Sequence, residues 1–166
     1  MSGKAGLIVG GRGAGKTTLA KSMLSKVSPA ARLVYDVNAE YRDLYPEPFL
    51  EFDEFTSKVN RAHNAFILIE ESTIFLSTRG NNFDIRSALV KARHNNNTFI
   101  LVFHSLRSVP VYILTLCDFI VLLKTGDTSD DVNKKFNTPA LTSAFNELQA
   151  LPRDRHPYRI IKLLGN

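Results

Sequence analysis

The stretch that decides the fold is Gly10-Gly11-Arg12-Gly13-Ala14-Gly15-Lys16-Thr17. It matches G-x-x-x-x-G-K-[ST] in full and follows the apolar run Leu7–Val9, so a strand leads into a glycine-rich turn that opens a helix. Glycines adopt positive φ values at no steric cost, which lets successive backbone N–H groups face an anion. The sequence therefore predicts a phosphate-binding loop for a nucleoside triphosphate.

The side chains of this loop predict the ligands in more detail. Lys16 supplies a point charge for the outer phosphates, and the Thr17 hydroxyl is suited to ligate Mg²⁺. A helix expected over roughly Lys16–Val27 directs its positive dipole end at the same anion. We expect ATP and Mg²⁺ as cofactors, with nucleotide contacts from Gly10, Gly11, Arg12, Gly13, Ala14, Gly15, Lys16, Thr17 and Thr18.

Composition limits the class of protein. The 166 residues predict one domain over 1–166, and 44% hydrophobic with 22% charged residues is ordinary for a soluble globular chain. No apolar run approaches the ~20 residues that cross a bilayer, and the early strand leaves no room for a signal peptide. The chain has a single cysteine, Cys117, which rules out an internal disulfide and fits a reducing cytosol. Cys117 lies in an apolar stretch, which favours a buried thiol.

The excess positive charge of +5 is unevenly distributed. Residues 72–117 carry a net +4, which suits a polyanionic partner, although a solvated face is the default interpretation of any charge cluster. The charged residues of this region are Arg79, Arg86, Lys91, Arg93 and Arg107 against Asp84.

Strand and helix patterns alternate along the whole chain. Short, nearly continuous apolar runs predict strands at Leu7–Gly10, Arg32–Asp36, Phe66–Glu70, Phe99–His104, Phe119–Leu123 and Tyr158–Leu163. After the first helix, further helices are expected near Glu51–Ala62, Asp84–His94, Val111–Leu116 and Ala140–Leu151, and Gly126–Ser129 is expected to be a turn. This order predicts an α/β sandwich around a mostly parallel sheet.

Two carboxylates follow the third predicted strand. Adjacent strand side chains point to opposite sides, so Glu70 and Glu71 are not expected to share one task. We expect Glu70 to hold Mg²⁺, usually through water, and Glu71 to polarise the attacking water. The alternative is that both acids merely solvate a strand end.

His104 ends the fourth predicted strand, where ligands of open parallel sheets bind. It is a candidate sensor of the γ-phosphate, although a lone histidine is more often structural.

Together these residues resemble the FtsK–HerA superfamily of DNA-pumping ATPases, and most of all the small genome-packaging ATPases of viruses with an internal membrane. The resemblance rests on the loop, on Asp36-x-x-x-Glu40-Tyr41 and on Ile67–Glu71. The loop and the acidic strand are shared with many NTPases, and the choice of family is narrowed by the run KARHNNNTFILVFHSLRSVP at residues 91–110. It departs from the family at His104, where glutamine or asparagine is usual.

The resemblance implies a RecA-like P-loop NTPase fold, a three-layer sandwich with sheet order 5-1-4-3-2 plus an edge strand. It implies a ring, usually of six subunits, in which an arginine of one subunit completes the site of the next. Arg93 and Arg79 are the candidates for this arginine, and both could equally contact DNA or water. The segments Arg79–Asn82 and Arg107–Pro110 are candidates for the DNA-contacting pore.

The function implied is an ATP-hydrolysing motor that packages viral DNA into a preformed capsid, in the cytoplasm of the infected cell or on the virion, with capsid vertex proteins as partners. A P-loop kinase of small molecules would fit the size and the loop equally well. The Glu70-Glu71 pair and the aspartates of Lys124–Lys135, where a kinase would carry an arginine-rich lid, weigh against it. A non-catalytic nucleotide switch that supports assembly is the third alternative.

Overall fold

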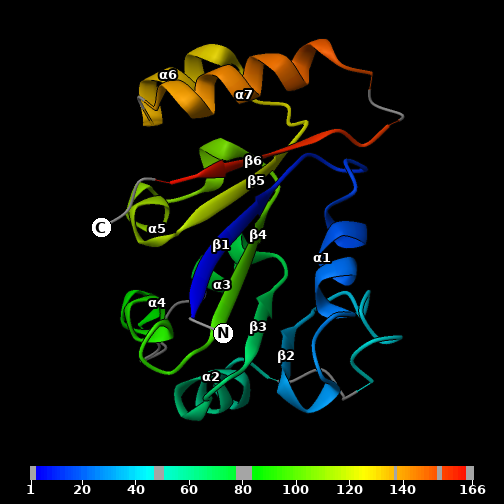
Figure 1. The fold of residues 1–166 in the computed structure, drawn as a ribbon, viewed down its shortest axis with the longest axis vertical. Helices are drawn as coiled ribbons and strands as arrows, with labels where there is room; N and C mark the ends of the chain where they lie inside the picture. Colours follow the sequence, from blue (N-terminus) through cyan, green and yellow to red (C-terminus); the bar gives the residue numbers. More distant parts are fainter. Residues whose placement is uncertain (1–2, 47–50, 78–83, 137, 153–154, 164–166) are drawn as a thin grey trace.

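The computed structural model describes residues 3–46, 51–77, 84–136, 138–152 and 155–163. Its centre is a six-stranded sheet in the order β2-β3-β4-β1-β5-β6 (Figure 1). The strands are β1 (Lys4–Val9), β2 (Arg32–Tyr35), β3 (Phe66–Ile69), β4 (Thr98–Phe103), β5 (Phe119–Leu123) and β6 (Tyr158–Lys162). All six were expected from the apolar runs; β5 has the predicted bounds, and the ends of the other strands agree with the prediction or differ by one to three residues.

The pairing confirms the expected sheet order with an added edge strand. β1 pairs in parallel with both β4 and β5, and β3 pairs in parallel with both β2 and β4, whereas β6 runs antiparallel to β5. The register places Val9 opposite Phe103 and Ile69 opposite Leu101. The carboxyl ends of β1, β3 and β4 therefore meet at one edge of the sheet, where parallel α/β folds hold their ligands.

Helices cover both faces of the sheet and make the expected three layers (Figure 1). One face is covered by α1 and the segment 36–46, and the other by the remaining α-helices. The α-helices are α1 (Lys16–Leu24), α2 (Phe52–Arg61), α3 (Ser72–Ser77), α4 (Ile85–Ala92), α5 (Val111–Leu116), α6 (Ser129–Phe136) and α7 (Pro139–Ala150). Two short 3₁₀ turns, η1 (Pro29–Ala31) and η2 (Leu106–Ser108), precede β2 and follow β4.

The strands are apolar throughout because both of their faces are buried. In β1, Leu7 and Val9 join the larger hydrophobic cluster, whereas Ile8 between them joins the cluster beneath α1. All three side chains are fully buried. This alternation follows from the period of two in a strand, and it fixes β1 as the central strand that delivers the glycine loop.

The structure adds two helices that the sequence patterns did not predict, α3 and α6. The expected turn at Gly126–Ser129 gives way to α6 at Ser129, because Thr128 and Asp131 form a capping box. Thr128 N donates to Asp131 Oδ2 at 3.0 Å, and Asp131 N donates to Thr128 Oγ1 at 3.2 Å. α1 ends at Leu24 rather than Val27, because the chain tightens there into bonds between residues three apart.

In the part of the chain that the structure describes, no helix has the length and apolar character that a bilayer crossing requires.

Candidate nucleotide-binding site

The glycine loop lies at the carboxyl end of β1 and opens α1, as its motif predicts. Gly13 and Gly15 have φ values of +72° and +95°, which other residues adopt only with strain. Two backbone bonds fix the start of the loop: Gly10 N donates to Phe103 O at 3.1 Å, and Gly11 N donates to Lys124 O at 2.7 Å. The loop is thereby held between the end of β4 and the segment after β5.

Lys16 is buried and folds back over this loop. Its Nζ donates to the carbonyl oxygen of Gly11 at 3.2 Å. Burial lowers the pKa of the Lys16 ammonium, and the nearby carboxylates, led by Glu70, oppose that change. The Lys16 ammonium is thus held against a backbone carbonyl of the loop.

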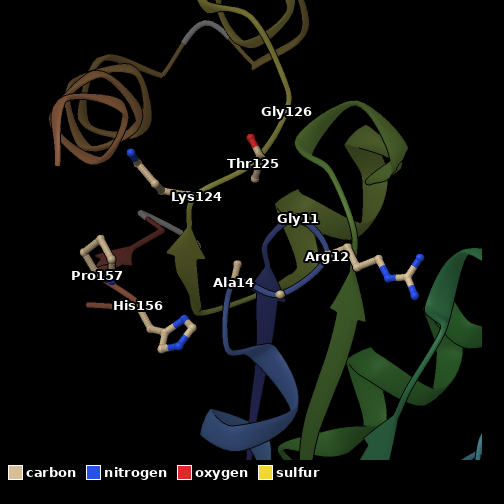
Figure 2. Close-up of a pocket in the computed structure, with 9 residues that line it drawn as sticks. Gly11, Arg12, Ala14, Lys124, Thr125, Gly126, His156 and Pro157 are labelled. Carbon is tan, nitrogen blue, oxygen red and sulfur yellow. The ribbon is translucent and has the colours of Figure 1, made fainter. Parts of the chain in front are cut away.

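Arg12 and Thr18 are both exposed. In Figure 2 the Arg12 side chain extends away from Lys124 and His156.

Glu70 directly follows β3 and is almost completely buried, with 2% of its surface exposed. The Tyr41 hydroxyl, also buried, donates to Glu70 Oε2 at 2.6 Å. Burial raises the pKa of Glu70, while this hydrogen bond acts in the opposite direction. Burial and the adjacent Glu70 raise the pKa of Tyr41, so the phenol remains a donor.

Glu71 points to a different partner. Its Oε1 lies 2.7 Å from His104 Nε2, which joins the second residue after β3 to the first residue after β4. Glu71 has a φ of +52°, a left-handed conformation that is uncommon outside glycine and is found at functional sites. The two adjacent acids therefore have separate surroundings: Glu70 bonds Tyr41, and Glu71 contacts His104.

The oxygen ligands near the loop fit Mg²⁺ when a nucleotide supplies the rest. Thr17 Oγ1 donates to Glu40 Oε2 at 3.3 Å, so Glu40 adds a carboxylate that the metal prediction of Thr17 and Glu70 did not include. Among the described residues, no three acidic, histidine or cysteine side chains lie close enough to hold a metal alone. Mg²⁺ commonly binds through one or two carboxylates, waters and substrate phosphates, and the residues near the loop offer the Thr17 hydroxyl and the carboxylates of Glu40 and Glu70.

Of the two candidate arginines, the structure describes Arg93. Arg93 follows α4 at the opposite edge of the sheet, where it pairs with Asp118, and Asp118 also accepts a bond from Ala5 N at 2.8 Å. Arg93 thus lies away from the loop of its own chain. Arg79 and the segment Arg79–Asn82 lie outside the described residues. Arg107 begins the other candidate segment, and its side chain is 69% exposed.

A cavity of about 290 Å³ adjoins the loop (Figure 2). The residues that line it opposite the loop were not predicted from the sequence. Gly11–Ala14 form one side, Lys124–Gly126 a second, and His156 with Pro157 a third. A Cβ atom at Gly15 would stand 3.3 Å from the His156 ring, so the imidazole packs directly on the start of α1. Gly126, just past the carboxyl end of β5, was the available signal, whereas nothing local marks His156.

The fold is shared with viral genome-packaging enzymes. The DNA-packaging ATPase B204 of Sulfolobus turreted icosahedral virus superposes with a TM-score of 0.74 at 14% identity, covering 99% of this chain and 100% of that one. The genome-packaging NTPase B204 of Sulfolobus turreted icosahedral virus 2, in complex with AMPPCP, gives 0.72 at 14% identity and covers 100% of both chains.

The N-terminal domain of zonular occludens toxin from Neisseria meningitidis gives a TM-score of 0.53 at 12% identity, over 76% of this chain and 79% of that one. No protein-family model and no curated protein matches the sequence. The likeness is therefore one of fold, and the chain has the three-layer α/β architecture of a P-loop NTPase.

Proposed function

We propose that this chain is an ATP-hydrolysing motor subunit that moves viral DNA into a preformed capsid. The observation that carries the proposal is the convergence of Lys16, Glu70 and the Glu71–His104 pair at one edge of a P-loop sheet. The fold of two packaging NTPases matches this chain from end to end, which supports an NTP hydrolase over the other functions that a P-loop fold can have.

In this proposal the triphosphate lies on the glycine loop, and the nucleoside occupies the cavity beside His156. Binding exchanges the Lys16–Gly11 bond for bonds from Lys16 to the outer phosphates. Thr17 and Glu70 would hold Mg²⁺ together with the phosphates, and the ion would neutralise charge on the transferring phosphoryl group.

Glu71 orients the attacking water and takes its proton. The side chain is only 17% exposed, which limits bulk water around the carboxylate, and the contact with His104 fixes its direction. His104 is 49% exposed, contacts Glu71 and directly follows β4, the neighbour of β1 in the sheet, so we assign it the response to the γ-phosphate.

The proposed assembly is a homo-oligomeric ring, with six subunits as the expected number. Arg93 or Arg79 of one subunit would stabilise charge at the site of its neighbour. The side chain of Arg93 is 52% exposed, so reaching a neighbour requires only the exchange of Asp118 for a phosphate. We place the motor in the infected cell or on the virion, with capsid vertex proteins as its partners.

DNA contacts are assigned to the basic region 72–117 and act on the backbone, independent of base sequence. Arg107 supports this assignment because it lies on the turn that follows His104, so movement at the nucleotide would be passed to a DNA-contacting residue.

ATP turnover with and without DNA tests the proposal. We expect DNA of any sequence to stimulate hydrolysis, with stimulation lost as salt rises. Lys16→Ala should remove ATP binding, and Lys21→Ala is the matched control, because Lys21 lies on the same helix and pairs with exposed Asp43.

Three results would contradict the motor. Phosphorylation of an added nucleoside or nucleotide would indicate a kinase. Tight ATP binding without turnover would indicate an assembly switch. Turnover that ignores DNA at low salt would leave an ATPase of another kind.

A further inference from the structure

Asp127, on the segment between β5 and α6, is a buried acid that the proposed mechanism does not use. Its side chain is completely buried, and it accepts two backbone bonds from η2: Leu106 N at 2.7 Å and Arg107 N at 3.2 Å. A buried carboxylate needs such partners, because an unpaired charge in the interior is strongly unfavourable. Asp127 therefore fastens η2 to the segment after β5.

Two cationic side chains, those of Arg107 and Lys135, lie near the same carboxylate. Arg107 Nε lies 3.9 Å from Asp127 Oδ1, and Lys135 of α6 donates to the Arg107 carbonyl. The junction thus joins η2, the segment after β5 and α6, and the Asp127 side chain at its centre accepts both backbone N–H groups.

One end of this junction is a wall of the cavity. Thr125 and Gly126 line the cavity, and Asp127 N donates to Thr125 Oγ1 at 3.3 Å. The wall is braced from behind, because Gln149 Nε2 of α7 donates to Thr125 O at 3.0 Å. A nucleoside that fills the cavity would press on a segment that cannot shift without moving Asp127.

The other end leads to the hydrolytic pair. η2 begins two residues after His104, whose Nε2 contacts Glu71 Oε1. Leu106 is fully buried, so the turn has a fixed anchor in the core beside its bond to Asp127. A continuous series of hydrogen bonds and chain connections therefore runs from the cavity wall through Asp127 and η2 to His104 and Glu71.

We propose that Asp127 is a positioning residue that couples a nucleoside in the cavity to the placement of His104 against Glu71. The inference rests on the proposed function, and it adds a specificity: hydrolysis is faster when the triphosphate carries a nucleoside than when it does not. Coupling between two sites requires an element whose position both sites bias. Here that element is the segment 124–128.

The first test uses the wild-type protein and adenosine, which carries no phosphate and so fills the cavity alone. The chain has four histidines, whose imidazole NMR signals can be assigned with His104→Gln and His156→Gln variants. We expect adenosine to shift the signals of both His156, in the cavity wall, and His104, outside it. A shift of His156 alone overturns the coupling, and no shift at either histidine overturns the assignment of the cavity.

The second test compares turnover of ATP with turnover of inorganic triphosphate. In Asp127→Asn an amide N–H₂ replaces one of the two accepting oxygens, so one backbone bond to η2 is lost. We expect the kcat for ATP divided by the kcat for inorganic triphosphate to be lower in Asp127→Asn than in the wild type. The decrease should be roughly 5-fold or more, which is the usual lower bound for coupled sites. Asp130→Asn is the matched control, since Asp130 is a nearby aspartate in the first turn of α6 and its side chain is 83% exposed.

The two failures are distinguishable. If wild-type protein hydrolyses ATP and the kcat ratio is unchanged in Asp127→Asn, the coupling is wrong and the motor stands. If wild-type protein hydrolyses neither compound, the motor is wrong, and the adenosine experiment still decides the coupling. That experiment also decides it if Asp127→Asn fails to fold.

Discussion

Replacing Tyr41 with phenylalanine isolates the bond that orients Glu70. The change keeps the buried ring and removes only the hydroxyl, which donates to Glu70 Oε2 at 2.6 Å. Glu70 is 2% exposed, so water does not readily replace the lost donor. The variant therefore leaves a buried carboxylate short of a partner without creating a large cavity.

The size of the effect follows from that burial. A hydrogen bond to a charged group contributes about 1.5–3 kcal/mol to the free energy of unfolding. In a domain of this length each kcal/mol moves the melting temperature by about 2–4 °C, so Tyr41→Phe should melt about 3–12 °C lower.

The loss should grow with pH. Burial holds the pKa of Glu70 above its ordinary 4.5 in the folded state, so the folded chain binds a proton that the unfolded chain has released. Stability therefore falls as pH rises from the ordinary value through the folded pKa. The Tyr41 bond opposes this shift, so its removal raises the folded pKa further and the added cost appears once Glu70 is ionised.

Thermal unfolding followed by circular dichroism at about pH 5 and about pH 8 measures both effects. Tyr112→Phe is the control: Tyr112 packs under Arg86, and among the described residues its hydroxyl makes no hydrogen bond. An equal loss at both pH values, or a loss no larger than that of the control, would refute the reasoning.

Three further predictions concern single side chains. Glu71→Gln should keep ATPγS binding but slow hydrolysis by about 10²–10⁴-fold, as expected for a lost general base, and normal turnover would exclude that role. Arg93→Ala subunits mixed with Lys16→Ala subunits should recover part of the activity that each lacks alone, whereas no recovery at any ratio counts against Arg93. Cys117 is buried and its pKa is raised to about 12, so a thiol reagent should label it only after unfolding.

The sequence predicted the sheet and the loop because both depend on local patterns. Continuous apolar runs mark strands that are buried on both faces, and the glycine motif needs only its own residues and the strand before it. The start of α6 could also have been predicted from the sequence, because Thr128 and Asp131 have the spacing of a capping box.

Other parts of the site arise only from tertiary structure. His156 comes 141 positions after Gly15 yet packs against it, and no local pattern connects the two residues. The contact of His104 with Glu71 likewise depends on β3 and β4 being neighbours, which the family resemblance implied, and on the left-handed backbone at Glu71, which no pattern indicated.

The bond from Lys16 to Gly11 has a consequence for how the free protein behaves. The Gly11 carbonyl already accepts a hydrogen bond from the Lys16 ammonium, in the way that a phosphate oxygen would. Each nucleotide that arrives must displace this internal partner, and the affinity measured is the difference between two similar attachments. Small anions such as sulfate gain little from that exchange, whereas a triphosphate with several oxygens in reach gains much more.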